Sequence, residues 1–204
     1  MAATVRVYAA SAGSAGNPVY NIVDTNPTDN PSGTKVSFSL ADAYNDTASP
    51  ITIPASGNRR FSDFRDLCLY VTVAAATTLS NLKVAQATGI TAGLELHVWN
   101  TPFAKAGYVL NTNGTNATSN PTTGTNAGTH PADDAITTGT APTGYANLPT
   151  DPTYYTFDAT GGSANAVGQV GKFATIVAAV LGTYAGGGNA STTLPNIKFQ
   201  YDEA

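Results

Sequence analysis

The two histidines are the residues of this 204-residue chain best suited to acid–base or metal chemistry. His97 lies between Leu96 and Val98 in an alternating segment, where an imidazole is able to serve as a general base. His130 lies in a stretch of low sequence complexity, where a preorganised site is difficult to build. We interpret His97 as a half-exposed strand histidine, and two histidines so placed leave little scope for a Ser-His-Asp or metal-hydrolase site.

Carboxylates offer two further chemistries. Asp133 and Asp134 are adjacent, and carboxylate oxygens are ligands that Ca²⁺ prefers. No spaced series of ligands surrounds the pair, so we interpret it as part of a solvated loop. A glycosidase needs two carboxylates that flank the scissile bond. The only glutamates are Glu95 and Glu203, and neither has an apparent partner in the sequence.

Cys68 is the only cysteine, which excludes an intrachain disulfide and a Cys-based metal site. It alternates with apolar residues of its segment, so we interpret it as a small half-buried side chain and not as a nucleophile. The glycine runs at 161–162 and 186–188 fit no phosphate-binding pattern and are interpreted as turns. We therefore expect no catalytic residue, no metal site and no cofactor.

Two features of the sequence allow both a structural and a functional interpretation. Arg60, Asp63, Arg65 and Asp66 concentrate four charges before the most regular alternating segment. They predict a salt-bridged corner or an interface patch, and we favour the corner. Trp99 ends a strand pattern, where it would stack on a sugar ring or plug the end of a sandwich, and we favour the plug.

The composition excludes several classes of protein. Charged residues make up 11% of the chain, the pI is about 4.8 and the largest basic cluster is Arg59-Arg60, which argues against a nucleic-acid partner. The chain has 33 Ala, 31 Thr, 20 Gly and 17 Asn. Thr, Gly and Asn are poor helix formers, which argues against a protein built from long helices. The longest apolar run, 173–181, is far shorter than the roughly 20 residues that span a bilayer. Residues 1–8 lack the pattern of a signal peptide, and we expect no membrane partner.

Short alternating segments supply the elements that would position these side chains. In the clearest, 67–73, Leu67, Leu69, Val71 and Val73 share one face. The same period recurs at 5–7, 36–40, 51–53, 82–84, 94–98, 108–110, 154–157 and 197–201. Such alternation gives a strand one buried and one solvent-exposed face, which is typical of antiparallel sheets. We therefore expect an all-β fold, an antiparallel β-sandwich or jelly roll of about eight to ten strands.

Two segments fit this pattern less well. Residues 167–181 are Ala-rich but contain β-branched residues, so we expect a strand that pairs with 197–201 through a long hairpin. Residues 111–153 are rich in Thr, Asn and Pro and predict a low-complexity arm inserted in a single domain, 1–204. An ordered inter-subunit arm and a plain mobile loop both remain open for it. Residues 11–34 resemble a shorter loop of the same kind.

Four segments carry a resemblance to a known group of proteins. They are residues 4–8, the block from 58–61 through 67–73, the pair 82–84 and 94–99, and the ending Ile-Lys-Phe-Gln-Tyr-Asp-Glu at 197–203. In these segments and in its Ala/Thr-rich, charge-poor style, the chain resembles small virion structural proteins of tailed bacteriophages. The resemblance implies a β-sandwich that serves as head decoration, head fibre or tail appendage.

From this resemblance we expect a non-enzymatic capsid decoration (cement) protein. It would bind the major capsid protein on the capsid surface of the virion, as a homotrimer, after synthesis in the host cytoplasm. The alternative is a tail or fibre-associated module that binds a host-surface glycan through Trp99, Tyr108, Tyr154 or Tyr155.

Overall fold

The computed structural model describes residues 2–14, 16–23, 36–40, 48–108, 136–138, 144–186 and 196–204. These residues contain twelve β-strands and one short 3₁₀ helix, η1 (Lys105–Gly107). The strands are β1 (Thr4–Ser14), β2 (Asn17–Ile22), β3 (Asn58–Phe61), β4 (Arg65–Val73), β5 (Thr78–Gln86), β6 (Leu94–Trp99), β7 (Ile136–Thr138), β8 (Tyr145–Asn147), β9 (Tyr155–Asp158), β10 (Gly162–Ser163), β11 (Gly168–Leu181) and β12 (Ile197–Glu203). The expected all-β, antiparallel, sandwich-like architecture is confirmed.

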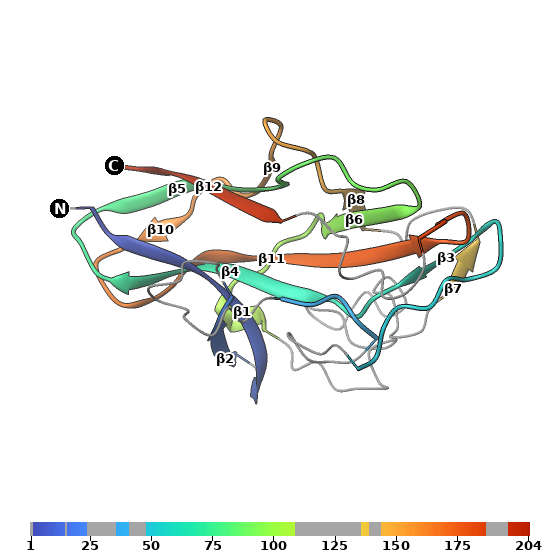
Figure 1. Cartoon of the computed structure of the whole chain (residues 1–204). Coiled ribbons are helices and arrows are strands. Elements are labelled where there is room, and N and C mark those ends of the chain that lie inside the picture. Colours follow the sequence, from blue (N-terminus) through green and yellow to red (C-terminus); the bar gives the residue numbers. More distant parts are fainter. Residues whose placement is uncertain are drawn as a thin grey trace.

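The larger sheet is built around β11, which has 14 residues and runs through its centre (Figure 1). One edge of β11 pairs with β4 and then with β3, and the other edge pairs with β6. β1 and β2 continue the sheet beyond β4, β7 lies beyond β3, and β8 lies beyond β6. All of these pairs are antiparallel, so hairpins and longer crossovers connect them.

The smaller sheet has β5 at its centre, with β12 on one edge and β9 and β10 on the other. β5 contains a bulge, because its register with β12 shifts opposite Gln200 and Asp202 and Asn81 has a positive φ of 50°. The turn between β9 and β10 requires Gly161, since a Cβ there would lie 1.8 Å from the backbone oxygen of Leu79.

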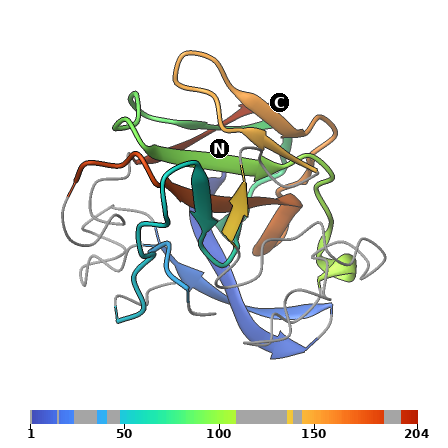
Figure 2. The same ribbon diagram turned by 90° about the vertical axis from the view of Figure 1, so that its right-hand side faces the viewer.

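The two sheets face each other across the main apolar core, and Figure 2 shows them as two stacked layers. Leu67, Leu69 and Val71 of β4 point into this core, as their alternation predicts. Leu82 and Val84 enter it from β5. The alternating side chains of both sheets therefore form one contiguous interior.

The opposite face of the larger sheet is also buried. Phe173 packs there with Cys68, Phe103 and Tyr108. Val177 belongs to a separate aromatic cluster on the same face. β11 is consequently buried on both faces, which explains its unbroken run of apolar residues.

The strand predicted at 167–181 exists, but its predicted partner is wrong. β11 pairs with β3, β4 and β6, whereas β12 pairs with β5 in the other sheet. The physical reason is the double-sided burial of β11, which places it at the centre of a sheet with two partner edges. β12 buries only one face and lies at an edge of the smaller sheet.

Other expectations about strands also need correction. Residues 36–40 and 51–53 alternate but do not form strands; they insert Phe38 and Ile51 into the core from irregular backbone. Tyr108 follows η1 and is not in a strand. β2 lies inside the segment expected to be a loop, 11–34, and pairs with β1.

The segment 111–153 contributes two short strands, β7 and β8, that its composition did not indicate. Leu148 follows β8 and is buried in the main core. Residues 111–135 and 139–143 lie outside the described residues, as do His130, Asp133 and Asp134. Within the described part of the chain, no helix is long and apolar enough to cross a membrane.

Candidate functional site

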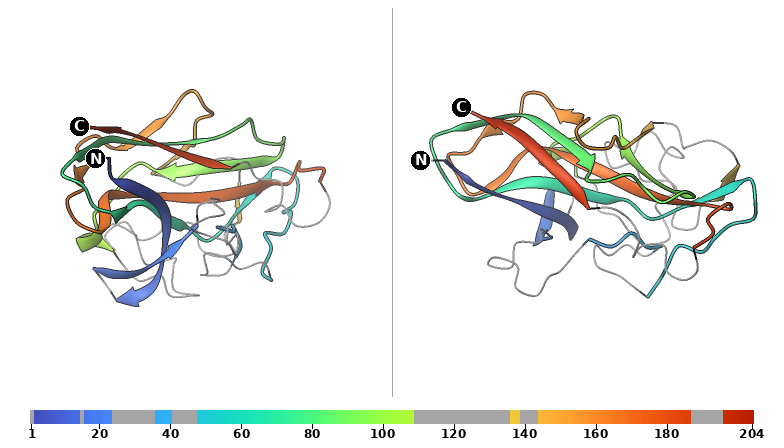
Figure 3. Two further views of the ribbon diagram at one scale, coloured as in Figure 1. Left: turned by 60° about the vertical axis from the view of Figure 1, so that its left-hand side comes forward. Right: turned by 45° about the horizontal axis from the view of Figure 1, so that its top comes forward.

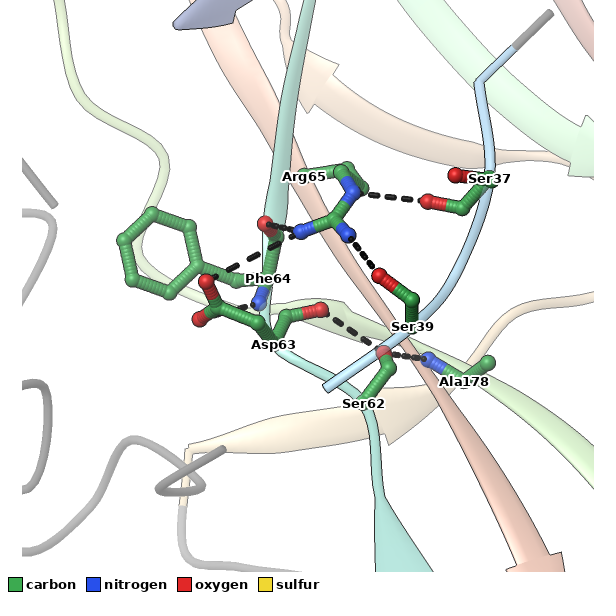
Figure 4. A network of polar contacts seen from close by, with 7 residues as sticks. All are labelled: Ser37, Ser39, Ser62, Asp63, Phe64, Arg65 and Ala178. Carbon is green, nitrogen blue, oxygen red and sulfur yellow. Dashed lines mark hydrogen bonds and ion pairs between the residues drawn. The ribbon is translucent and has the colours of Figure 1, made fainter. Parts of the chain in front are cut away.

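Asp63, just before β4, and Arg65 and Asp66, the first two residues of β4, form a buried corner (Figure 4). The guanidinium of Arg65 donates from Nε to the backbone oxygen of Ser37 at 2.7 Å and from Nη2 to Ser39 Oγ at 3.2 Å. Its Nη1 donates to the backbone oxygen of Phe64 at 2.8 Å and lies 3.8 Å from Asp63 Oδ2. Because the charge of Arg65 is both paired and hydrogen-bonded, it is tolerated at 3% exposure.

This corner has a structural task that the residues themselves explain. Arg65 ties the irregular segment 36–40 to the junction between β3 and β4. Asp63 Oδ1 accepts a hydrogen bond from the backbone N–H of Phe64 at 2.9 Å, which fixes the turn. Asp66 accepts a 2.5 Å hydrogen bond from the hydroxyl of Thr175 on β11. The expected salt-bridged corner is confirmed for Asp63 and Arg65. Asp66 is buried in the corner but is hydrogen-bonded to Thr175, and Arg60 instead donates to Thr52.

A second cluster of ionisable groups joins β3 and β6. Glu95 Oε1 accepts a hydrogen bond from Arg59 Nη2 at 3.0 Å, and Glu95 Oε2 lies 2.8 Å from His97 Nε2. An ionised carboxylate only accepts, so Nε2 of His97 carries the proton. The hydrogen bond from His97 lowers the pKa of Glu95, and Arg59 lowers it further against the opposing effect of partial burial.

His97 is buried, so the expectation of a half-exposed histidine is wrong. Its side chain is 1% exposed and its ring centroid lies 5.8 Å from that of Phe61. The cause is that both faces of β6 are covered, one by the main core and one by the aromatic cluster. With Nε2 held by Glu95 and no solvent access, this imidazole orients its neighbours in the fold and does not reach a substrate.

Trp99 is buried, as a plug would be, but it lies in the aromatic cluster on the outer face of the larger sheet and not at the end of the sandwich. Its indole is 2% exposed and packs edge-on against Tyr145, with ring centroids 4.9 Å apart. A tryptophan in this position cannot stack on a sugar ring. Tyr108 is also buried, at 3% exposure, so Tyr154 and Tyr155 are the partly exposed residues of the four proposed for a glycan.

Cys68 is fully buried among Phe103, Tyr108 and Phe173. Burial raises the pKa of its thiol, and the nearby charge of Asp66 raises it further. A thiol in this environment stays protonated and unreactive, as the sequence predicted, although its burial is complete and not partial.

One small hollow lies near the Arg59–Glu95 pair. It measures about 100 Å³ and lies between the β3 and β11 ends, lined by Gly57, Asn58, Arg59, Leu181, Gly182 and Thr183. Sites for small ligands are usually about 300–1,000 Å³. Within the described ranges, no three His, Cys, Asp or Glu side chains converge as a metal site would require.

One end of the sandwich exposes apolar side chains that the sequence analysis did not single out. Val73 is 55% exposed at the end of β4, and Val167 is 61% exposed before β11. Ala74, Ala76 and Ala166 beside them are also exposed, and we call these five residues the apolar end. The signal available in the sequence was the absence of charge from 73–82 and from 159–171.

Two loops form the apolar end and are tied together by their backbones. The backbone N–H of Ala75 donates to the oxygen of Ala164 at 2.9 Å, and the N–H of Ala164 donates to the oxygen of Thr77 at 2.9 Å. Ser163 and Thr78 are paired in the smaller sheet directly beneath these loops. The apolar end is therefore a fixed surface and not a pair of independent loops.

Comparison with models of known families, with curated proteins and with solved structures finds no match to this chain.

Proposed function

We propose that this protein is a structural component of a virion, a decoration or cement protein that binds the major capsid protein and stabilises the shell. The observation that carries the proposal is the apolar end, where Val73 and Val167 are more than half exposed. Contiguous exposed apolar surface is uncommon on monomeric proteins and marks interaction sites. A shell contact of this kind needs shape and apolar burial and requires no chemistry.

The state of the chemically capable side chains supports a binding role. Asp63, Arg65 and Asp66 are buried in the corner, His97 is held by Glu95, and Cys68 is enclosed by aromatic rings. Each of these groups has a structural contact that accounts for it. The fixed backbone of the apolar end supports the same role, because a preorganised surface loses little conformational entropy when it binds.

The first test is the composition of the particle. Purified particles of the phage whose genome encodes this chain are analysed by quantitative mass spectrometry. A decoration protein is expected in numbers comparable to the major capsid protein. A small fraction of that number indicates a tail or fibre appendage, and absence from the particle overturns the proposal.

The second test addresses the apolar end directly. We expect the double variant Val73→Asp/Val167→Asp to lose at least about tenfold in affinity for shells, because two carboxylates would be desolvated at the contact. Val19→Asp on β2, where the side chain is 49% exposed, is the matched control and should bind as the wild type does. Co-sedimentation with shells stripped of the protein measures both. If the double variant and the control variant bind shells equally well, the apolar end is not the surface that contacts the shell.

The Thr/Asn/Pro-rich stretch is expected to add contacts across a subunit boundary, and a deletion tests this. The deletion has to spare Tyr145 and Leu148, which are buried in the fold. A chain lacking only 111–134 should therefore keep its fold and bind shells more weakly. If it binds as tightly as the full chain, the stretch is a loop without a role in attachment.

A further inference from the structure

β12 lies at an edge of the smaller sheet and is hydrogen-bonded to β5 on one side. On its other side, the described residues provide no backbone partner for it. Figure 3 shows the two chain ends close together, so that the end of β12 lies near the start of β1. The amide of Ala3 donates to Glu203 Oε1 at 2.9 Å, a side-chain contact that leaves the β12 backbone edge open.

The hydrogen-bond pattern defines which residues present this open edge. Thr78 and Ala204 exchange both of their backbone hydrogen bonds, at 2.8 and 3.0 Å, and Ala87 N–H donates to the oxygen of Asn196 at 2.7 Å. Hydrogen-bonded and non-hydrogen-bonded pairs alternate along an antiparallel ladder. The even-numbered residues of β12 therefore point their backbone groups toward β5, and the odd-numbered residues point theirs outward.

The side chains of β12 divide in the same way. Ile197, Phe199 and Tyr201 are partly buried against the main core. Lys198 and Asp202 are exposed on the other face of the strand, with Gln200 between them. The open edge thus combines outward backbone donors and acceptors with one basic and one acidic side chain, spaced symmetrically about Gln200.

We propose that β12 pairs with β12 of a second copy of this chain, antiparallel across a two-fold axis that passes beside Gln200. Phe199 then faces Tyr201 of the second copy as a hydrogen-bonded pair on the core side. Lys198 faces Asp202 of the second copy as a non-hydrogen-bonded pair on the exposed side, where opposed side chains approach most closely. The two smaller sheets become one continuous sheet.

Charge complementarity selects this register. Only the odd-numbered residues offer outward backbone groups, so one strand can shift past the other only by two residues at a time. Each such shift moves the two-fold axis by one residue. A register centred on Phe199 places Lys198 opposite Gln200, and one centred on Tyr201 places Asp202 opposite Gln200. The register centred on Gln200 alone aligns the whole of β12 and forms two Lys198–Asp202 pairs.

The contacts that these side chains make within one chain are compatible with the pairing. Lys198 Nζ lies 2.5 Å from Asp151 Oδ2, and an ammonium group has three donors. Asp202 uses Oδ2 to accept a 2.7 Å hydrogen bond from Asn81, which leaves Oδ1 for a lysine of the second copy. Both side chains are exposed and are therefore accessible to the second copy.

A charge swap tests the register. We expect the full-length protein to sediment as a dimer, and Lys198→Glu or Asp202→Lys to raise the dimer dissociation constant at least about tenfold. The double variant K198E/D202K restores opposite charges and should recover dimerisation. Lys105→Glu, at an exposed lysine of η1, is the control for the change in net charge and should leave the constant unaltered.

Cross-linking tests the position of the axis. The Cβ atoms of residue 200 in the two copies would lie about 4.5–5.5 Å apart, close to what a disulfide needs. Gln200→Cys should therefore form a covalent dimer under mild oxidation, while Thr156→Cys on β9, at the opposite edge of the same sheet, should not. Cys68 is buried and does not interfere.

The proposal does not depend on the role in a virion, and it differs from the trimer that the resemblance implies. A monomeric or trimeric wild-type mass at high micromolar concentration overturns it. The proposal is also overturned if the double variant dimerises no more tightly than the single variants. It is overturned as well if Gln200→Cys and Thr156→Cys cross-link at the same rate. A dimer, charge-swap rescue and selective cross-linking at residue 200 together support it.

Discussion

The hydroxyl of Ser62 replaces a backbone carbonyl in the central ladder of the larger sheet. Its Oγ accepts a hydrogen bond from the backbone N–H of Ala178 at 2.9 Å, while Ser62 N–H donates to the oxygen of Ala178 at 2.8 Å. The same hydroxyl donates to the backbone oxygen of Asp63 at 2.7 Å. Residues 62–64 separate β3 from β4, and the hydrogen bonds of Ser62 continue the pairing with β11 across this interruption. β3 and β4 therefore follow the same edge of β11.

Replacing Ser62 with alanine should destabilise the protein. The change leaves the N–H of Ala178 without its acceptor inside the sheet, which costs about 1–3 kcal/mol of unfolding free energy. Urea unfolding measures the loss. Ser163→Ala is the control, because its exposed Oγ accepts only a 3.3 Å contact from Asn165, and it should change stability by less than about 0.5 kcal/mol. Equal effects of the two variants contradict the role of Ser62.

Replacing Glu95 with glutamine should change how stability depends on pH. The folded protein lowers the pKa of Glu95 through His97 and Arg59, so the ionised carboxylate adds stability above the ordinary pKa of about 4.3. That contribution is lost as pH falls through the lowered pKa. The variant should therefore be less stable than wild type at neutral pH, and the gap should narrow toward about pH 3. Denaturant unfolding across this range measures it, and a constant gap contradicts the coupling.

Trp99 is the only tryptophan and provides a direct optical measurement of its cluster. Its burial predicts blue-shifted emission that iodide quenches weakly. Gly144 has a φ of 91°, and a Cβ there would lie 2.5 Å from Trp99 Cζ3, so Gly144→Ala should displace the indole. We expect a red shift and a loss of about 1–3 kcal/mol in stability. Gly89→Ala, where nothing lies within 4 Å of the new Cβ, should leave both unchanged.

Cys68 should be inert toward thiol reagents in the native protein. Burial and the charge of Asp66 raise the pKa of its thiol, so little thiolate is present, and the surrounding rings block access. Its modification should appear only as the protein unfolds in denaturant. Thr156→Cys supplies an exposed thiol in the same chain, and one of its two thiols should react at once. Rapid modification of wild type would contradict the enclosed position.

Alternation predicts those strands whose two faces differ. Leu67, Leu69 and Val71 face the core and Thr72 lies on the other side, so β4 was predictable from its residues. β11 is buried on both faces, and an apolar run without alternation indicates a strand without indicating its partners. β7 and β8 consist of three residues each, too few to show a period.

The candidate site was predictable to a similar degree. The density of charge at Asp63, Arg65 and Asp66 in a chain with few charges indicated a corner before the structure located it. The burial of His97 was not predictable, because Phe61 packs against its ring from β3, and the sequence does not reveal that β3 and β6 both pair with β11. The apolar end was missed because two separate loops form it, and neither is unusual alone.

The central position of β11 has a consequence for how the chain is made. β1, β2, β3 and β4 leave the ribosome before β6 and β8, and within the described strands only β11 joins these two groups into one sheet. The larger sheet therefore closes after residue 181 has been synthesised, through pairings between distant parts of the chain, which are slow to form. A nascent chain that stops before residue 168 retains unpaired strand edges on both groups and is prone to aggregate.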